Sequence, residues 1–416
     1  MRTHSDRKNP LACPDRATRR DFLRAAAIAA PVSACAQALS PQPYFGLHPF
    51  IEANPKAVFI RRTRVPDRGD AAAKLREGLT LSSQIFVPMS QPGIPITHRI
   101  ILKPNVFSTD VAFYEGVVMG LRGLGLRSLH FIEANQFHDW ARRGYVDANE
   151  RQGVEMNECE RRRRHFREGY DMTWTKVPDA VIYSRIPHYA PVNEPNTWML
   201  NIAKWRSHGM CLTQAVKNEQ GLVVLPFVRF CAGWPMVTGA PEFMQPDINP
   251  RAEAVVNQFF DRHVRMGYSR YQSRADLSPI RQEIWAHKTL DNMSVLKTGL
   301  SMIEAIYPDA PGHEKTLTNL VLFSKDKFRL DLIGLYLGGH EPGNIHVYRI
   351  AKERGLSDTF NPWEVPVYEW SDSGTALPRK LTDFARTPLK TYYLQKDGEP
   401  EFHLVDEPFD YDRHKV

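Results

Sequence analysis

The sequence predicts an α/β protein with a mostly parallel sheet, helices on both faces, helical insertions and a C-terminal β-hairpin. A buried strand, an amphipathic helix and a second buried strand follow one another within residues 98–133. Such a succession forms a parallel crossover unit. Further short apolar runs recur downstream, and 42% of the 416 residues are hydrophobic. No apolar run reaches the ~18–20 residues of a membrane-spanning helix, so a globular domain is expected.

The first crossover unit opens the predicted main domain, residues 98–360. Residues 39–97 before it form an N-terminal extension rich in proline, with one short helix expected over 71–78. The apolar run 98–103 predicts a buried strand. Thr109 or Asp110 is placed to cap the helix that follows.

Apolar side chains recur on one face of this helix, which we expect to end near residue 124, before a strand at 129–133. The apolar positions are Val111, Val117, Val118 and Leu121.

Two insertions are predicted in the main domain, a helical one at 138–180 and a proline-rich one at 225–288. The second contains an amphipathic helix at 251–266. Other elements are expected as strands at 179–183, 198–202 and 317–323, and as helices at 287–306 and 344–355, the last capped by Asn344 and ended by Gly355.

The C-terminal extension, residues 361–416, is expected to contain a hairpin. Apolar runs at 392–395 and 402–405 flank Asp397-Gly398, a dipeptide favoured in tight hairpin turns.

Residues 1–38 predict a signal peptide that is read by the twin-arginine translocase. Arg19 and Arg20 lie in a segment, 18–24, that resembles the twin-arginine consensus, and a short apolar region follows. Two processing routes stay open. Cleavage after Ala38 would release a periplasmic protein, whereas acylation of Cys35 would leave a lipoprotein anchored to the membrane.

The charge and the cysteines argue against nucleic-acid binding and against an iron–sulfur cluster. Removing the seven basic and three acidic residues of 1–38 from totals of 54 and 47 leaves 47 and 44, so the small remaining excess does not favour a nucleic-acid partner. No Cys-x-x-Cys pair is present, so an iron–sulfur cluster lacks its usual ligand set. Outside the leader, three cysteines could form one disulfide or remain thiols: Cys159, Cys211 and Cys231.

A dense polar run at 204–221 follows the strand expected at 198–202. Ligands bind open α/β sheets at the carboxyl ends of strands. If residues 210–218 are helical, Thr213 and Lys217 share one face. Lys204, His208 and Lys217 could then meet at an anion, with His208 moving a proton near neutral pH.

Two other strands also end in polar residues, namely Lys103 and Asn105 after the first and Glu133 after the second. A single lysine at a strand end is most often a solvated surface group. Several polar ends at one sheet edge favour a shared pocket, in which we expect Lys103, Glu133, Lys204, His208 and Lys217 to meet.

These segments resemble the bacterial and archaeal domain-of-unknown-function family 362 over about residues 98–357. The matching positions are Lys103, Pro104 and Asn105, then Lys204, His208, Thr213, Lys217, Asn218 and Gly221, and a late segment with Asp331, Gly339 and Pro342. The resemblance implies an α/β fold, often with a twin-arginine leader. Many relatives carry iron–sulfur motifs that this chain lacks, and the cofactor stays unknown.

The sequence thus predicts an exported enzyme acting on a small anionic molecule. The alternative is a non-catalytic periplasmic binding or accessory protein that uses the same basic pocket. The expected catalytic residues are His208, Lys217 and Glu133, and the expected substrate contacts are Lys103, Asn105, Lys204, Thr213 and Asn218.

Overall fold

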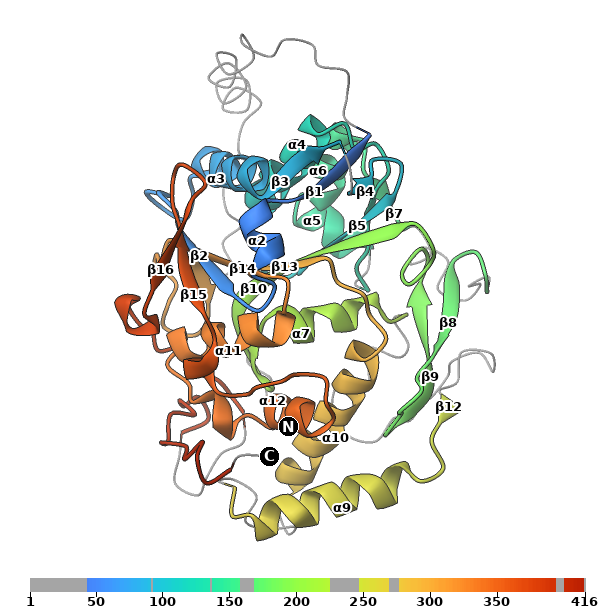
Figure 1. Ribbon diagram of the computed structural model, residues 1–416, viewed down its shortest axis with the longest axis vertical. Helices are drawn as coiled ribbons and strands as arrows, with labels where there is room; N and C mark the ends of the chain where they lie inside the picture. The colour runs from blue at the N-terminus through green and yellow to red at the C-terminus, as the bar shows by residue number, and fades with distance from the viewer. Residues whose placement is uncertain are drawn as a thin grey trace, which may run out of the picture.

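A mixed sheet of ten strands runs through the middle of the described protein (Figure 1). The computed structural model describes residues 43–90, 93–134, 137–157, 168–224, 247–268, 277–393 and 400–414. The strands along the sheet are β16 (Ala376–Arg379), β15 (Val367–Trp370), β2 (Val58–Arg62), β14 (Leu320–Ser324), β13 (Leu300–Asp309), β10 (Thr197–His208), β5 (Arg99–Pro104), β6 (Leu129–Phe131) and β7 (Glu155–Met156), with β11 (Cys211–Thr213) paired to β10.

The central part of the sheet is parallel, as the crossover unit predicts. Strands β13, β10, β5, β6 and β7 all run in one direction. Strand β14 is antiparallel to both of its neighbours, and β15 pairs with β2 in parallel. The α/β class with a mostly parallel sheet is therefore confirmed. Strands from the N- and C-terminal extensions join this same sheet.

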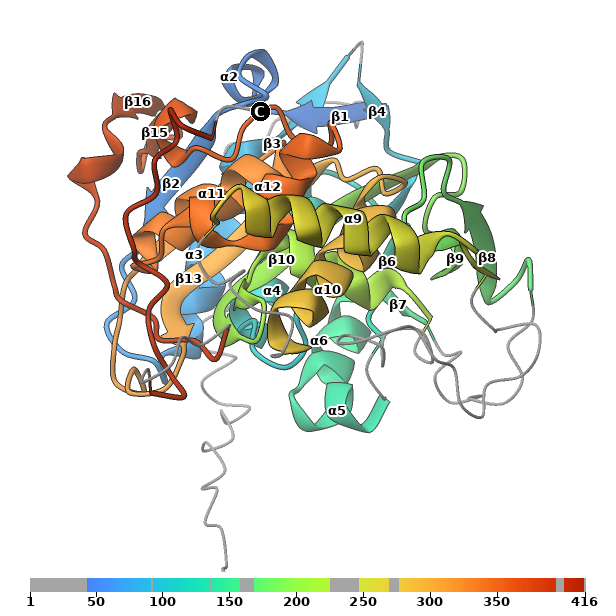
Figure 2. The ribbon, with the colours of Figure 1, turned by 90° about the horizontal axis from the view of Figure 1, so that it is seen from below.

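Helices cover both faces of the sheet (Figures 1 and 2). One face packs against α3 (Ala71–Ile85), α4 (Val111–Gly123) and α6 (Tyr145–Gln152), and we call it the α4 face. The other packs against α7 (Ala215–Asn218), α10 (Leu277–Met293), α11 (Lys327–Leu337) and α12 (His346–Glu353), and we call it the α11 face.

Strand side chains alternate between these two faces. In β10, Leu200 and Ile202 enter the core under the α4 face, whereas Met199 and Ala203 enter the core under the α11 face. Two smaller sheets flank the main one. They consist of β3 (Phe86–Met89), β1 (Tyr44–Leu47) and β4 (Ile94–Pro95), and of β12 (Asp247–Ile248), β9 (Tyr183–Tyr189) and β8 (Met172–Lys176).

Several predicted elements are confirmed where local chemistry specifies them. Asp110 caps α4 by accepting hydrogen bonds from the N–H groups of Ala112 (3.0 Å) and Phe113 (3.4 Å). The strands expected at 98–103, 129–133, 198–202 and 317–323 correspond to β5, β6, β10 and β14, and the helix expected at 251–266 is α9 (Ala252–Arg265). The helix expected at 71–78 continues as α3 to Ile85.

The prediction of a helix at 287–306 is wrong in its second half. Helix α10 ends at Met293, and the buried strand β13 begins at Leu300. Gly299 lies between them, where a Cβ atom would come within 2.1 Å of Nε1 of Trp198. Packing against Trp198 therefore favours glycine immediately before β13.

Other segments also differ from the predictions. Residues 179–182 form no strand, because the N–H groups of Val181 and Ile182 bond to the buried carboxylate of Asp291. The insertion at 138–180 holds α5 (Phe137–Arg142) and α6 but also β7 and β8. Helix α12 begins after Ile345 rather than Asn344, whose side chain donates to the carbonyl of Glu407 (2.7 Å).

The C-terminal extension contains a hairpin, but not where it was expected. Strands β15 and β16 form it. Near the expected position, Thr391 and His403 make an isolated antiparallel bridge, and the Asp397-Gly398 turn lies outside the described residues. The leader with Arg19, Arg20 and Cys35 also lies outside them, as do Cys159 and Cys231.

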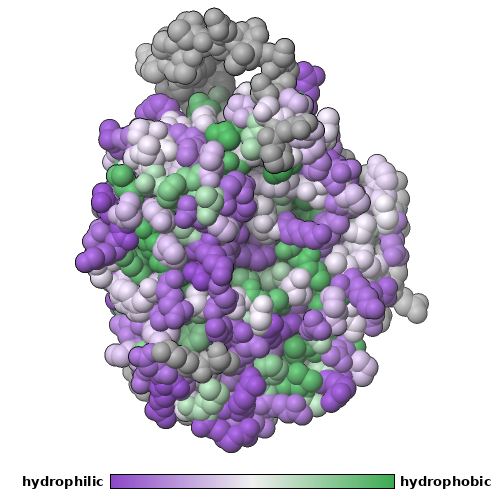
Figure 3. Space-filling model, in the orientation of Figure 1, coloured by the Kyte–Doolittle hydropathy of each residue, from purple (hydrophilic) through white to green (hydrophobic). Residues whose placement is uncertain are grey.

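The surface mixes polar and apolar residues. On the face shown in Figure 3, hydrophobic residues form several small patches between hydrophilic ones. Within the described ranges, no helix is both long and apolar enough to cross a membrane.

Candidate functional site

Lys103 and Glu133 meet at the carboxyl ends of the neighbouring parallel strands β5 and β6. The Lys103 Nζ donates to Glu133 Oε2 (2.8 Å), to the Pro104 carbonyl (2.8 Å) and to Asn218 Oδ1 (3.3 Å). All three side chains are buried on the α11 face. The structure thus brings together three of the predicted site residues, one of them from α7.

This buried group continues through residues that the sequence reasoning missed. Asn218 Nδ2 donates to Asn201 Oδ1 (2.7 Å), and Asn201 Nδ2 donates to Glu219 Oε1 (3.0 Å). Glu219 Oε2 accepts from Lys327 Nζ (2.6 Å). Asn201 lies inside the expected strand 198–202, and an amide in an otherwise apolar strand was the available signal.

Gly221 closes over the Lys103–Glu133 pair. A Cβ atom at this position would lie 2.3 Å from Glu133 Oε1 and 2.8 Å from Lys103 Nζ. Such distances are far below van der Waals contact, so any larger residue here would displace the ends of the Glu133 and Lys103 side chains.

Lys204 lies on the opposite face of the sheet. Its Nζ donates to Glu304 Oε2 (2.5 Å) and lies 3.4 Å from the ring centroid of Tyr307. Glu304 also accepts from the N–H of Asp110 (3.2 Å), at the start of α4. The expectation that all five residues share one pocket is therefore wrong. Asn201 and Lys204 are three residues apart in β10, and strand alternation sends them to opposite faces.

Both buried lysines already have counter-ions. Burial lowers the pKa of Lys103 and that of Lys204, and the adjacent glutamates oppose this shift. Because each ammonium group is neutralised within the protein, neither lysine offers an uncompensated charge to an anion.

His208 lies at the carboxyl end of β10, and its ring contacts those of Trp285 (5.3 Å between centroids) and Tyr392 (5.9 Å). Its Nδ1 accepts a hydrogen bond from the N–H of Met210 (3.2 Å). A neutral imidazole that accepts at Nδ1 carries its proton on Nε2. Burial, and then the charges of Lys217 and Arg206, lower the pKa of His208 to about 2.

His208 therefore stays neutral at physiological pH, whereas the sequence predicted a histidine that exchanges a proton near neutrality. It can still donate a hydrogen bond from Nε2.

A cleft of about 310 Å³ lies at the carboxyl ends of β10 and β13, beside His208. Arg206, Ser207 and Tyr392 line it, and Tyr392 also contacts the His208 ring. The Arg206 guanidinium pairs with Asp309 (3.2 Å), and the side chain of Arg206 remains 36% exposed. The cleft thus presents an accessible guanidinium group at the edge where ligands of α/β sheets bind.

The last two predicted contacts lie apart from the Lys103 group. Asn105 Oδ1 accepts from the Ser108 hydroxyl (3.0 Å). Thr213 belongs to β11, opposite Arg206, so Thr213 and Lys217 do not share a helical face. Residues 210–218 do not form one helix, as that shared face would require, but contain β11 and the short α7.

Asp331 fixes the start of α7. Its carboxylate accepts from the N–H groups of Ala215 (2.8 Å) and Val216 (2.9 Å) and from the Tyr348 hydroxyl (3.0 Å). Helix α7 carries both Lys217, which influences His208, and Asn218, which contacts Lys103. Asp331 therefore links the two parts of the candidate site.

Among the described residues, no group of three or more His, Cys, Asp or Glu side chains is arranged to hold a metal ion.

Comparison with family models, with characterised proteins and with solved structures finds no match for this chain. The resemblance to family 362 stays a prediction.

Proposed function

We propose that the protein is an exported enzyme that acts on a small anionic molecule in the cleft beside His208. One observation carries the proposal. A neutral imidazole lies at the carboxyl edge of the sheet with two cations, Lys217 and Arg206, close enough to lower its pKa. A bound anion would be attracted by these two cations, of which Arg206 also pairs with Asp309.

The chemistry follows from the tautomer of His208. Because Met210 N–H occupies Nδ1, the ring carries its proton on Nε2, and that N–H group would donate to a substrate oxygen. A donor that is already in place stabilises negative charge developing on that oxygen without reorganisation. Arg206, a planar donor suited to carboxylate and phosphate groups, would orient the substrate.

A second candidate function also has support. A histidine with a pKa of about 2 cannot take up a proton at neutral pH, and the cations alone suffice for binding. The alternative is thus a non-catalytic binding or accessory protein with the same cleft.

Changing Arg206 to glutamine should weaken ligand binding. We expect a panel of small phosphorylated and carboxylated compounds, screened by thermal shift, to yield a ligand whose affinity falls roughly tenfold or more in Arg206→Gln, because a charge-assisted hydrogen bond contributes about 1.5–3 kcal/mol. Arg185→Gln is the matched control, since Arg185 pairs with Asp247 at the same 3.2 Å on a distant strand. Equal weakening in both variants would exclude the cleft.

His208→Gln separates the two functions, because glutamine retains a donor but not the imidazole. Once a ligand has been identified, preserved binding and lost turnover in His208→Gln would support the enzyme. Binding without turnover in the wild-type protein would support the alternative.

The proposed export is tested independently of the site. Replacing Arg19 and Arg20 together with lysine should leave precursor in the cytoplasm, because the paired guanidinium groups are the feature that the twin-arginine translocase reads. Cell fractionation measures this, and periplasmic protein at the wild-type level would contradict it. Mass spectrometry of the mature N-terminus distinguishes an acylated Cys35 from cleavage after Ala38.

A further inference from the structure

A pocket of about 300 Å³ lies toward the amino ends of β5 and β10, away from the carboxyl ends that form the His208 cleft. Its walls come from β5, from the loop at 192–196, from the start of β10 and from Lys297 before β13. It shares no lining residue with the cleft beside His208. Its volume lies at the lower end of the range of about 300–1,000 Å³ that is typical of small-molecule sites.

The loop between β9 and β10 is held in place by hydrogen bonds. The N–H of Arg99 donates to the carbonyl of Asn196 (2.9 Å), and its Nη2 donates to the carbonyl of Pro195 (2.9 Å). The Thr197 hydroxyl donates to the carbonyl of Glu194 (2.7 Å). Because these walls are fixed before a ligand arrives, binding requires little ordering of the protein.

The position of Lys297 is fixed by the two residues that follow it. The Thr298 hydroxyl donates to the buried carboxylate of Glu219 (2.6 Å), and the N–H of Gly299 donates to the carbonyl of Met199 (2.9 Å). Lys297 itself is exposed, and its ammonium group makes no ion pair or hydrogen bond with the described residues. The pocket therefore has one positive charge without a counter-ion in the described part of the chain.

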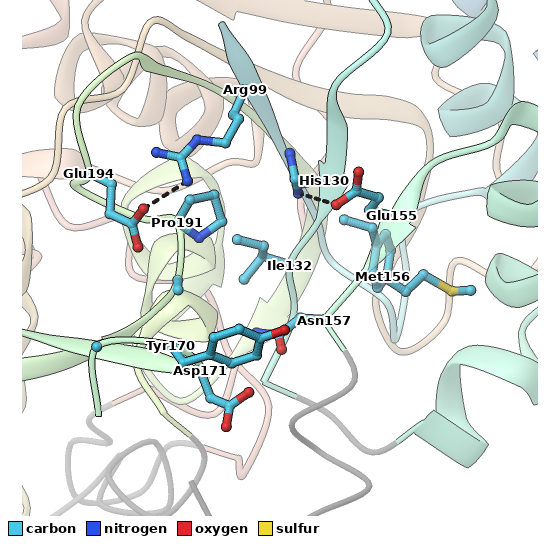
Figure 4. A pocket seen from close by; sticks show the side chains of 13 residues that line it. Arg99, His130, Ile132, Glu155, Met156, Asn157, Tyr170, Asp171, Pro191 and Glu194 are labelled. Carbon is cyan, nitrogen blue, oxygen red and sulfur yellow. Dashed lines mark hydrogen bonds and ion pairs between the residues drawn. The ribbon is translucent and has the colours of Figure 1, made fainter. Parts of the chain in front are cut away.

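Glu194 brings a negative charge to the same pocket. Its Oε2 pairs with Nη1 of Arg99 (2.7 Å; Figure 4), and its side chain is 25% exposed. Glu194 and Lys297 line one pocket without forming an ion pair with each other. Two accessible charges of opposite sign in one pocket suit a ligand that itself carries both signs.

The rest of the lining suits a small organic molecule. Ile101, Val192 and Met199 are buried apolar side chains of the pocket wall. Asn193 donates from Nδ2 to the Thr175 hydroxyl (3.2 Å), and its Oδ1 accepts no hydrogen bond from the described residues. A carboxamide oxygen in such a wall can accept from an amino group of a ligand.

We propose that this pocket binds a small zwitterion, an α-amino acid with an aliphatic side chain. Its carboxylate would pair with Lys297, its amino group would donate to Glu194 and to Oδ1 of Asn193, and its side chain would pack against Met199 and Val192. A simple carboxylate would leave Glu194 without a donor from the ligand, and a simple amine would leave Lys297 without a counter-ion. The site does not depend on the function proposed for the His208 cleft.

L-Leucine is a direct probe in isothermal titration calorimetry of the purified protein. Saturable binding with a Kd of about 1 mM or below is expected. Isocaproate lacks the amino group of leucine and isoamylamine lacks its carboxylate, so each should bind several-fold more weakly. Lys297→Met should weaken leucine binding about fivefold, the upper end for an exposed charge pair. Glu194→Gln should weaken the binding of leucine but not that of isocaproate.

Lys315→Met is the matched control, because Lys315 is another exposed lysine without an ion pair in the described part of the chain and does not line this pocket. Lys297 is exposed, so Lys297→Met should fold, and circular dichroism checks that it does. If Glu194→Gln does not fold, Lys297→Met and the two leucine analogues still decide. The proposal is overturned if leucine gives no saturable heat, if either analogue binds as tightly as leucine, or if Lys315→Met weakens binding as much as Lys297→Met.

Discussion

Replacing Lys204 with methionine is expected to lower the free energy of unfolding by about 3–5 kcal/mol. This is the usual range, about 3–5 kcal/mol, when one partner of a buried ion pair is removed. Lys204 and Glu304 are both completely buried, at 2.5 Å from each other. Methionine fills similar space but leaves the Glu304 carboxylate without its counter-ion inside the protein. Urea or guanidinium denaturation of the purified variant measures the loss.

Two further variants decide whether the unpaired charge is the cause. Lys325→Met breaks an exposed pair with Glu52 and should change stability by less than about 1 kcal/mol. Lys204→Met combined with Glu304→Gln removes the charge but retains an acceptor for the N–H of Asp110, and we expect it to recover much of the loss. A Lys204→Met variant as stable as Lys325→Met would contradict the argument. So would a double variant no better than the single one.

The parts of the fold that could be predicted are those that neighbouring residues specify. The capping of α4 by Asp110 and the apolar periodicity that follows it are local. The β5–α4–β6 unit has the expected order, and its bounds lie within about two residues of those expected. The lengths of α10 and β13 could not be predicted in the same way. The segment between them packs against a residue far away in the sequence, since Gly299 approaches Trp198, 101 positions earlier in the chain.

The candidate site shows the same division. The end of β5 and the end of β6 were correctly expected to lie together, because parallel neighbours end at one edge. The partner of Lys204 is Glu304, 100 residues away, and no pattern near Lys204 indicates it. Alternation along β10 could have shown that Asn201 and Lys204 face opposite sides. The depressed pKa of His208 was not predictable either, since it depends first on burial.

Asp331 and Asp291 are two buried carboxylates in similar roles but with different charges around them. Both accept hydrogen bonds from successive backbone N–H groups. Asp291 also pairs with Arg354 (2.7 Å). Within the described residues, the Asp331 side chain accepts hydrogen bonds from neutral donors, namely two N–H groups and the Tyr348 hydroxyl. Burial without a cation raises the pKa of Asp331 to about 7, against the opposing effect of these donors.

The stability of the wild-type protein should therefore fall between pH 5 and 8 relative to that of Asp331→Asn. The folded protein holds a proton on Asp331 up to about pH 7, whereas the unfolded chain releases it near pH 4. Folding thus takes up a proton in this window. The stability that the protonated Asp331 contributes is therefore fully present at low pH and is lost as the pH rises. Over this range the loss should be about 2–3 kcal/mol.

Denaturation curves at several pH values measure this difference, and subtracting the variant from the wild type removes the contribution of all other groups. Asp291→Asn is the control, because it removes a carboxylate that has an arginine partner and should cost stability throughout the window. Hydrogen exchange at the N–H groups of Ala215 and Val216 reports whether deprotonation of Asp331 also changes the strength of their hydrogen bonds to its carboxylate. A constant difference between wild type and Asp331→Asn from pH 5 to 8 would show that Asp331 is already ionised, and that the three donors outweigh its burial.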